Sequence, residues 1–91
     1  MELPTELTLH QNHPNPFNPS TVVSFGLPEA GILRLAVYDV LGREVAVLAD
    51  GTFAAGWHQV RFDATGLATG MYLYRIQTGA SVITKRMVLL K

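Results

Sequence analysis

The histidines are the side chains of this sequence whose spacing first suggests chemistry. His10 and His13 lie three residues apart in HQNH, and on a helix this spacing would bring two imidazoles to one face as metal ligands. The proline after His13 disfavours a helix there, and the third ligand of a zinc site would have to be the distant His58. We therefore expect exposed loop histidines and no metal site.

The serines and carboxylates do not form a catalytic pattern either. The three serines, Ser20, Ser24 and Ser81, lack the glycine-flanked turn that presents a nucleophilic serine. The Asp and Glu residues stand singly at expected turns or strand ends, where carboxylates commonly cap the backbone or face water. Because catalysis needs a nucleophile, an acid–base pair or a metal cluster, we predict a protein that is not an enzyme and that binds no cofactor.

Four aromatic residues, Trp57, Tyr38, Tyr72 and Tyr74, could form a platform for sugar binding, because aromatic faces suit the apolar C–H surfaces of sugar rings. Alternation puts Trp57 on the outward face of its strand, which makes it the candidate for stacking on sugar. For the tyrosines the stronger interpretation is that their rings pack inward.

The segment DATGLATG predicts a compact corner before residue 70. Asp63 can accept hydrogen bonds from the backbone that follows it, and Gly66 and Gly70 permit positive φ. Leu67, Gly70 and Tyr72 are spaced as in a tyrosine corner, in which the tyrosine hydroxyl bonds to nearby backbone. We expect Leu67 to fill the core beneath the corner.

Composition excludes several classes of protein. The 91 residues have a formal net charge of zero and contain no cysteine, so neither a disulfide nor a thiolate metal site is possible. Lys and Arg are scattered except at the end of the chain, and nucleic acid is therefore not an expected partner. No apolar run approaches the roughly 18 residues of a membrane helix, and residues 1–4 do not resemble a signal peptide. We predict no transmembrane segment.

The chain shows an apolar period of two residues, interrupted by turn-forming residues at short intervals, and this pattern predicts β-strands joined by short turns. Val23, Phe25 and Leu27 alternate with smaller or polar residues, and the same pattern recurs along the chain. We predict an all-β, immunoglobulin-like β-sandwich of about seven antiparallel strands. The expected strands cover residues 7–10, 21–27, 32–39, 43–50, 57–63, 71–77 and 81–91.

The segment HPNPFNP, residues 13–19, predicts a rigid approach to the second strand. Each proline fixes φ and removes a backbone donor, and each residue before a proline is extended. We expect a stiff, non-pairing arm that lies over the fold. Phe17 is its expected anchor, because burial of the ring contributes about 1.5–3 kcal/mol.

The last two predicted strands carry apolar residues on both faces, as in MYLYRIQ and KRMVLLK. Strands of this kind are expected in the middle of a sheet or against a partner. The charged residues of the last strand have two interpretations. They could belong to a recognition element, or they could protect a sheet edge from aggregation, which is a common use of lysine.

Four separated segments of the chain resemble, in order and spacing, the type A C-terminal sorting domains of the type IX secretion system. They are NHPNPFNPSTVVSFGLPEAG, LRLAVYDVLGREVAVL, GWHQVRFDATGLATGMYLYRI and TKRMVLLK. Two of them, around YDVLGREV and GMYLYRI, also resemble flagellar hook-assembly immunoglobulin-like domains. The resemblance to the sorting domains covers residues 9–91, which leaves residues 1–8 as an expected linker from a preceding module.

The resemblance implies which residues carry sorting information. The early motif corresponds to Pro14, Asn15 and Pro16, and the glycine–tyrosine motif to Gly70 and Tyr72. The terminal motif corresponds to Lys85, Arg86, Val88, Leu90 and Lys91.

The resemblance also implies a route and partners. The chain would follow a cargo domain, fold in the periplasm, be recognised by the outer-membrane machinery of type IX secretion, and reach the cell surface or the medium. A sortase-like protease would cut on its N-terminal side and join the cargo to the surface. The alternative function is a carbohydrate-binding or adhesive accessory domain of a secreted enzyme, with Trp57 stacking on sugar.

Overall fold

A computed structural model of the protein describes residues 3–91, and every regular element in that range is a strand. The seven strands confirm the predicted all-β class. They are β1 (Thr8–Leu9), β2 (Ser20–Leu27), β3 (Gly31–Tyr38), β4 (Glu44–Phe53), β5 (Gly56–Asp63), β6 (Gly70–Thr78) and β7 (Val82–Leu89).

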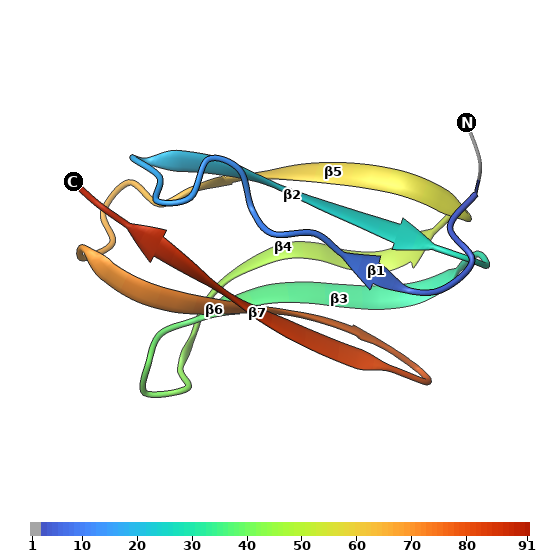
Figure 1. Ribbon diagram of the computed structural model, residues 1–91. Helices are drawn as coiled ribbons and strands as arrows, with labels where there is room; N and C mark the ends of the chain where they lie inside the picture. Colours follow the sequence, from blue (N-terminus) through green and yellow to red (C-terminus); the bar gives the residue numbers. More distant parts are fainter. Residues whose placement is uncertain (1–2) are drawn as a thin grey trace.

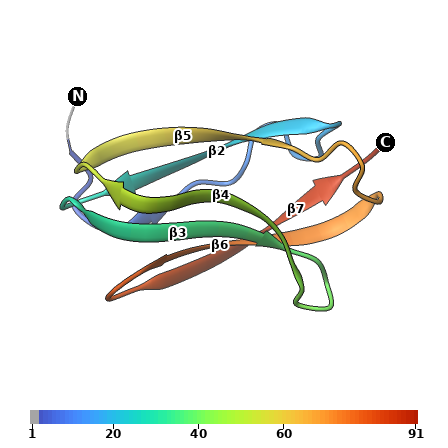
Figure 2. The ribbon, with the colours of Figure 1, turned by 180° about the vertical axis from the view of Figure 1, so that it is seen from behind.

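The strands form two sheets that pack face to face (Figures 1 and 2). The smaller sheet has the order β1-β2-β5 and the larger one the order β4-β3-β6-β7, with antiparallel pairing throughout both. This arrangement is the predicted immunoglobulin-like sandwich. The N-terminal end of the described chain and the C-terminus lie at opposite ends of the sandwich in both views.

The core lies between the sheets and follows the predicted alternation. Val23, Phe25 and Leu27 of β2 are buried, and β3 contributes Leu33, Leu35 and Val37. On β6 and β7 the buried residues are Tyr72, Tyr74, Ile76, Met87 and Leu89. Because inward residues alternate with outward ones along each strand, the outward faces of both sheets remain available for contacts with other molecules.

The corner before β6 is a tyrosine corner, as predicted. Tyr72 is buried, and its hydroxyl donates a hydrogen bond to the carbonyl of Ala68. Asp63 accepts the backbone N–H of Thr65 at 2.9 Å. Leu67, which was expected to fill the core beneath the corner, is only partly buried against it, whereas Ala64 is fully buried. The Leu67 N–H donates to the Ala64 carbonyl and closes a tight turn.

Replacement of Tyr72 by phenylalanine is expected to lower the free energy of unfolding by about 1 kcal/mol, the net contribution of one hydrogen bond. In a domain of this size such a loss lowers the melting temperature by roughly 4–8 °C. Thermal unfolding followed by circular dichroism measures the change. An unchanged melting temperature would show that the hydroxyl does not fasten the corner.

The β3–β4 turn is organised by Asp39. One carboxylate oxygen accepts the backbone N–H groups of Leu41 at 2.9 Å and Arg43 at 3.0 Å, and the other accepts the Arg43 guanidinium. Gly42 has a φ of 84°, the left-handed residue that the sequence predicted for this turn. The Arg43 backbone N–H, followed by its side chain and the Leu41 N–H, lowers the pKa of Asp39 from its usual value.

This lowered pKa makes the turn sensitive to acid. A carboxyl whose pKa is lower in the folded than in the unfolded protein stabilises the fold above its unfolded pKa, and this stability is lost as the pH falls through its folded pKa. We expect the amide signals of Leu41 and Arg43 to shift together below about pH 4. An NMR titration tests this, with Asp39→Asn as the control in which both shifts should disappear.

Candidate functional site

The proline-rich arm, residues 11–19, crosses from one sheet to the other. His13 forms an isolated antiparallel bridge with Val22 of β2, and Phe17 forms a parallel bridge with Leu89 of β7. The prediction of a non-pairing arm is therefore wrong. A proline removes only its own donor, and the residues between the prolines keep N–H groups that can pair.

The arm covers part of the outer edge of β7. The Phe17 N–H donates to the Val88 carbonyl at 3.0 Å, and the Phe17 carbonyl accepts the Leu90 N–H at 3.0 Å. Asn15 accepts the Val88 N–H through its side chain at 3.0 Å. The Gln11 side chain donates to the Arg86 carbonyl at 2.7 Å.

The two alternatives predicted for the last two strands, a place in the middle of a sheet or against a partner, divide between them. β6 lies in the middle of its sheet, as expected, but β7 is an edge strand. The arm takes the place of a further strand along the second half of β7. Because unpaired strand edges invite pairing with other chains, the arm protects this edge over Arg86–Leu90.

A buried asparagine near the start of the arm bonds the arm to β2 and β6. The Asn12 side chain, 2% exposed, donates to the Pro14 carbonyl at 3.1 Å and to the Thr21 hydroxyl at 3.0 Å. The Asn12 N–H donates to the Tyr74 hydroxyl, which in turn donates to the His10 carbonyl. Sequence reasoning missed Asn12, Thr21 and Tyr74 as arm supports, because nothing local marks one loop asparagine as buried.

The predicted burial of the Phe17 ring is confirmed. Phe17 is 2% exposed, and its ring centroid lies 6.0 Å from that of Phe62. Pro14 and Pro16 on either side of Asn15 are exposed. The early motif thus contributes one carbonyl, that of Pro14, and one side chain, that of Asn15, to the hydrogen bonds of this region.

The terminal motif divides between two faces of β7. Met87 and Leu89 point into the core, so Arg86 and Val88 point outward, and Leu90 continues this outward row. Lys85 is half-buried on the core side of the strand, and Lys91 is exposed with its N–H donating to the Thr69 hydroxyl. Only Arg86, Val88 and Leu90 form one accessible row.

The glycine–tyrosine motif has a structural explanation. Gly70 begins β6 at a φ of 151°, a conformation that side chains rarely adopt, and it pairs with Leu89. Two residues later, Tyr72 makes the corner bond. These two residues therefore bring the start of β6 beside the end of β7, and the Asn15–Val88 contact brings the arm to the same place.

Comparison with protein families matches residues 12–90 to the secretion system C-terminal sorting domain, the sorting domain of type IX secretion. The chain belongs to this family. A search of curated proteins found no match. Membership identifies a sorting signal for type IX secretion, and with it an interaction with that machinery, a cargo in the same chain, and delivery to the cell surface or extracellular space.

The sorting domain does not assemble the four-aromatic platform considered from the sequence. Tyr72 and Tyr74 are buried in the core, Tyr38 lies on the larger sheet and Trp57 on the smaller one. Trp57 faces outward, as predicted, and is 40% exposed. It borders a shallow groove of about 350 Å³ lined by His10, Ser24, Trp57, His58 and Gln59.

The three histidines of the sorting domain are separated. The His10 ring meets Trp57 edge-on at 5.2 Å, and the His58 ring stacks on Phe25 at 5.3 Å. His13 lies on the exposed arm. Within residues 3–91 no three histidine or carboxylate side chains lie close enough together to hold a metal ion, and no helix is suited to crossing a membrane.

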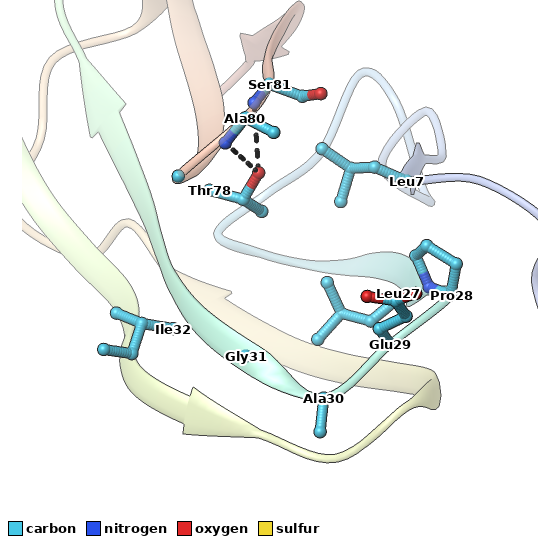
Figure 3. A pocket seen from close by; sticks show the side chains of 11 residues that line it. Leu7, Leu27, Pro28, Glu29, Ala30, Gly31, Ile32, Thr78, Ala80 and Ser81 are labelled. Atoms are coloured by element: carbon cyan, nitrogen blue, oxygen red, sulfur yellow. Dashed lines mark hydrogen bonds between the residues drawn. The ribbon is translucent and has the colours of Figure 1, made fainter.

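A second hollow, of about 400 Å³, lies between the β2–β3 and β6–β7 turns (Figure 3). Leu7, Leu27 and Pro28 line one side, and Thr78 lines the other. The Thr78 hydroxyl accepts the N–H groups of Ala80 and Ser81, which fixes the β6–β7 turn. Most of the residues that line this hollow of the sorting domain are apolar or glycine, and the Thr78 hydroxyl is already bonded to its own turn, which leaves few side chains to orient a ligand.

Proposed function

We propose that this chain is a non-catalytic sorting module that directs a cargo protein across the outer membrane by type IX secretion and to attachment at the cell surface. The observation that carries the proposal is the convergence of three separated motifs at the β7 edge. Asn15 bonds to Val88, Gly70 pairs with Leu89, and Arg86, Val88 and Leu90 form an accessible row. A receptor can contact such a row on a folded domain.

The proposed route includes folding in the periplasm and cleavage by a sortase-like protease on the N-terminal side, within or before the linker of residues 1–8. Two observations bear on that site. Leu3 is 61% exposed, but Pro4 is buried, and its ring would meet a side chain placed at Gly26. A protease would therefore reach the chain most readily before Pro4, at the end of the sandwich remote from the C-terminus.

Export of a fusion protein tests the proposal. A periplasm-directed fluorescent cargo is joined to residues 1–91, with and without the residues after Thr84, and expressed in a type IX host. We expect surface delivery only with the complete domain. Folded full-length fusion that remained in the periplasm would contradict the proposal.

Truncation also removes the buried Met87 and Leu89, and a loss of export could then reflect unfolding. The matched variant therefore replaces only the outward row, as Arg86→Ser, Val88→Ser and Leu90→Ser, and keeps the inward residues. Loss of export by this variant with a retained cooperative thermal transition would assign recognition to the outward row.

The groove beside Trp57 favours a second candidate function, carbohydrate binding. An exposed indole edged by histidine, serine and glutamine side chains combines a stacking surface with hydrogen-bonding groups. Titration with soluble polysaccharides, followed by Trp57 fluorescence, measures it. A spectrum that no polysaccharide shifts would remove this candidate.

A further inference from the structure

The charges of this chain are separated along the sequence and in the fold. Four of the seven Lys and Arg residues follow Asp63, and none of the seven Asp and Glu residues does. These four cations, Arg75, Lys85, Arg86 and Lys91, are on the β6–β7 hairpin or directly after it. None of them forms a salt bridge within residues 3–91, whereas Arg34 and Arg43 are both paired with carboxylates.

An apolar surface lies beside two of these cations, Arg75 and Arg86, on the outward face of the larger sheet. Met71 of β6 is directly opposite Val88 of β7, and Leu73 is opposite Arg86. Met71 is 43% exposed and Leu90 is 50% exposed. Outward neighbours on adjacent antiparallel strands lie side by side, so these apolar residues make one continuous surface.

A cation is also held at the side of this surface. The Arg75 guanidinium lies 5.0 Å from the centre of the Tyr38 ring, and Tyr38 is the β3 neighbour of Leu73. Contact with the ring fixes the position of the guanidinium without neutralising its charge. Arg75 and Arg86 therefore flank Leu73 on the outward face.

We propose that this β6–β7 face is a single docking surface for a protein of the outer-membrane export machinery. The contact region of that protein would be apolar at its centre and acidic at its rim. The face consists of Met71, Leu73, Arg75, Arg86, Val88 and Leu90. The inference rests on the proposed sorting function and extends the contact beyond the terminal motif to β6. Charge complementarity indicates the chemistry of the partner. Cations that have no salt bridge and lie beside apolar residues favour a partner surface that carries carboxylates beside its own apolar residues.

The position of the face suits this role. Met71, Val88 and Leu90 lie at the start of β6 and the end of β7, and this end of the sandwich is opposite the one at which the described chain begins (Figure 1). The arm runs along the edge of β7 and does not cover the outward side chains of Met71 or Leu90.

Two matched serine variants test the apolar part in the export fusion. Met71 and Val47 are both 43% exposed and both face outward from the larger sheet, but Val47 lies on β4, at the opposite edge. We expect Met71→Ser to lower surface delivery on the order of tenfold, the effect of losing one interface side chain. Val47→Ser should be delivered like the parent, and both variants should keep its melting temperature.

The outcomes separate this inference from the proposed function. If the parent fusion is not delivered, the sorting function fails. If the parent is delivered and Met71→Ser is delivered equally well, the sorting function stands and the docking face is wrong.

Charge reversal tests the acidic partner. We expect Arg86→Glu to lower delivery at least as strongly as Met71→Ser, while Arg61→Glu, an exposed cation of the smaller sheet, is delivered normally. An anionic membrane is the competing occupant, and sedimentation of the purified chain with phosphatidylglycerol vesicles distinguishes it. If Arg86→Glu abolished vesicle binding but left delivery unchanged, the face would be a membrane-binding surface and the proposal would be overturned.

Discussion

Phe17→Ala is expected to lower the free energy of unfolding by about 3–5 kcal/mol. The transfer of a phenylalanine ring from water contributes only about 1.5–3 kcal/mol. The remainder comes from a cavity that cannot collapse, because the backbone on both sides of Phe17 is fixed. The Phe17 N–H and carbonyl are both bonded to the β7 edge, at Val88 and Leu90. Urea denaturation of the purified chain measures the loss.

The same substitution is expected to reduce export. The free energy of unfolding of a native protein is about 5–15 kcal/mol. If this domain is at the lower end of that range, the Phe17→Ala variant has a substantial unfolded fraction. The arm would also lose its anchor and expose the edge of β7 over Arg86–Leu90. We therefore expect less surface delivery together with more cargo retained or degraded before the outer membrane.

Two further variants make the Phe17 prediction decisive. Leu41→Ala removes an apolar side chain that is 75% exposed at the β3–β4 turn, and its effect should stay within about 0.5 kcal/mol. Phe17→Leu keeps part of the buried volume and should fall between Leu41→Ala and Phe17→Ala. If Phe17→Ala were as mild as Leu41→Ala, the ring would not anchor the arm.

The strands of the sandwich could be predicted from the sequence because their determinants are local. Val23, Phe25 and Leu27 bury alternate side chains of one strand, and that period is visible in the residues themselves. The turn at Gly42 and the corner at Tyr72 have equally local signatures. The alternation of apolar residues also indicates which side of each strand faces the core.

The pairing of the arm could not be predicted, because its partners are distant in sequence. Asn15 bonds to Val88, and Asn12 bonds to Tyr74, across more than sixty residues. The rules for proline describe the arm itself and do not specify which edge it meets. The apolar pattern of β7 was misleading for the same reason, since Val88 and Leu90 lie outward beside an edge that the arm covers.

The candidate site was predictable only in part. The family resemblance supplied the motif residues, but it did not separate those with a structural task from those a receptor can reach. The fold makes that division, because Gly70 and Tyr72 build the corner while Arg86 and Leu90 face outward. Met71 and Leu73, which lie between and beside motif residues, gain significance only from their cross-strand neighbours.

Tyr74→Phe is expected to cost about 2–4 kcal/mol, more than Tyr72→Phe, although each variant removes one hydroxyl. The Tyr74 hydroxyl donates to the His10 carbonyl at 2.8 Å and accepts the Asn12 N–H at 2.9 Å. Its removal leaves two backbone groups without partners, one in the arm and one directly before it, and the Asn12 N–H is in a buried position. Urea denaturation of the two variants side by side measures the difference.

Alkaline titration provides an independent measurement of the same hydroxyl. Burial raises the pKa of Tyr74, although the Asn12 N–H opposes this shift. A raised folded pKa stabilises the protein below the unfolded pKa, near 10, and this stability is lost as the pH rises through the folded pKa. The parent should therefore lose stability above pH 10 more steeply than Tyr74→Phe. Equal slopes, or equal costs for the two phenylalanine variants, would mean that the arm is fastened at Phe17 and the β7 edge without help from Tyr74.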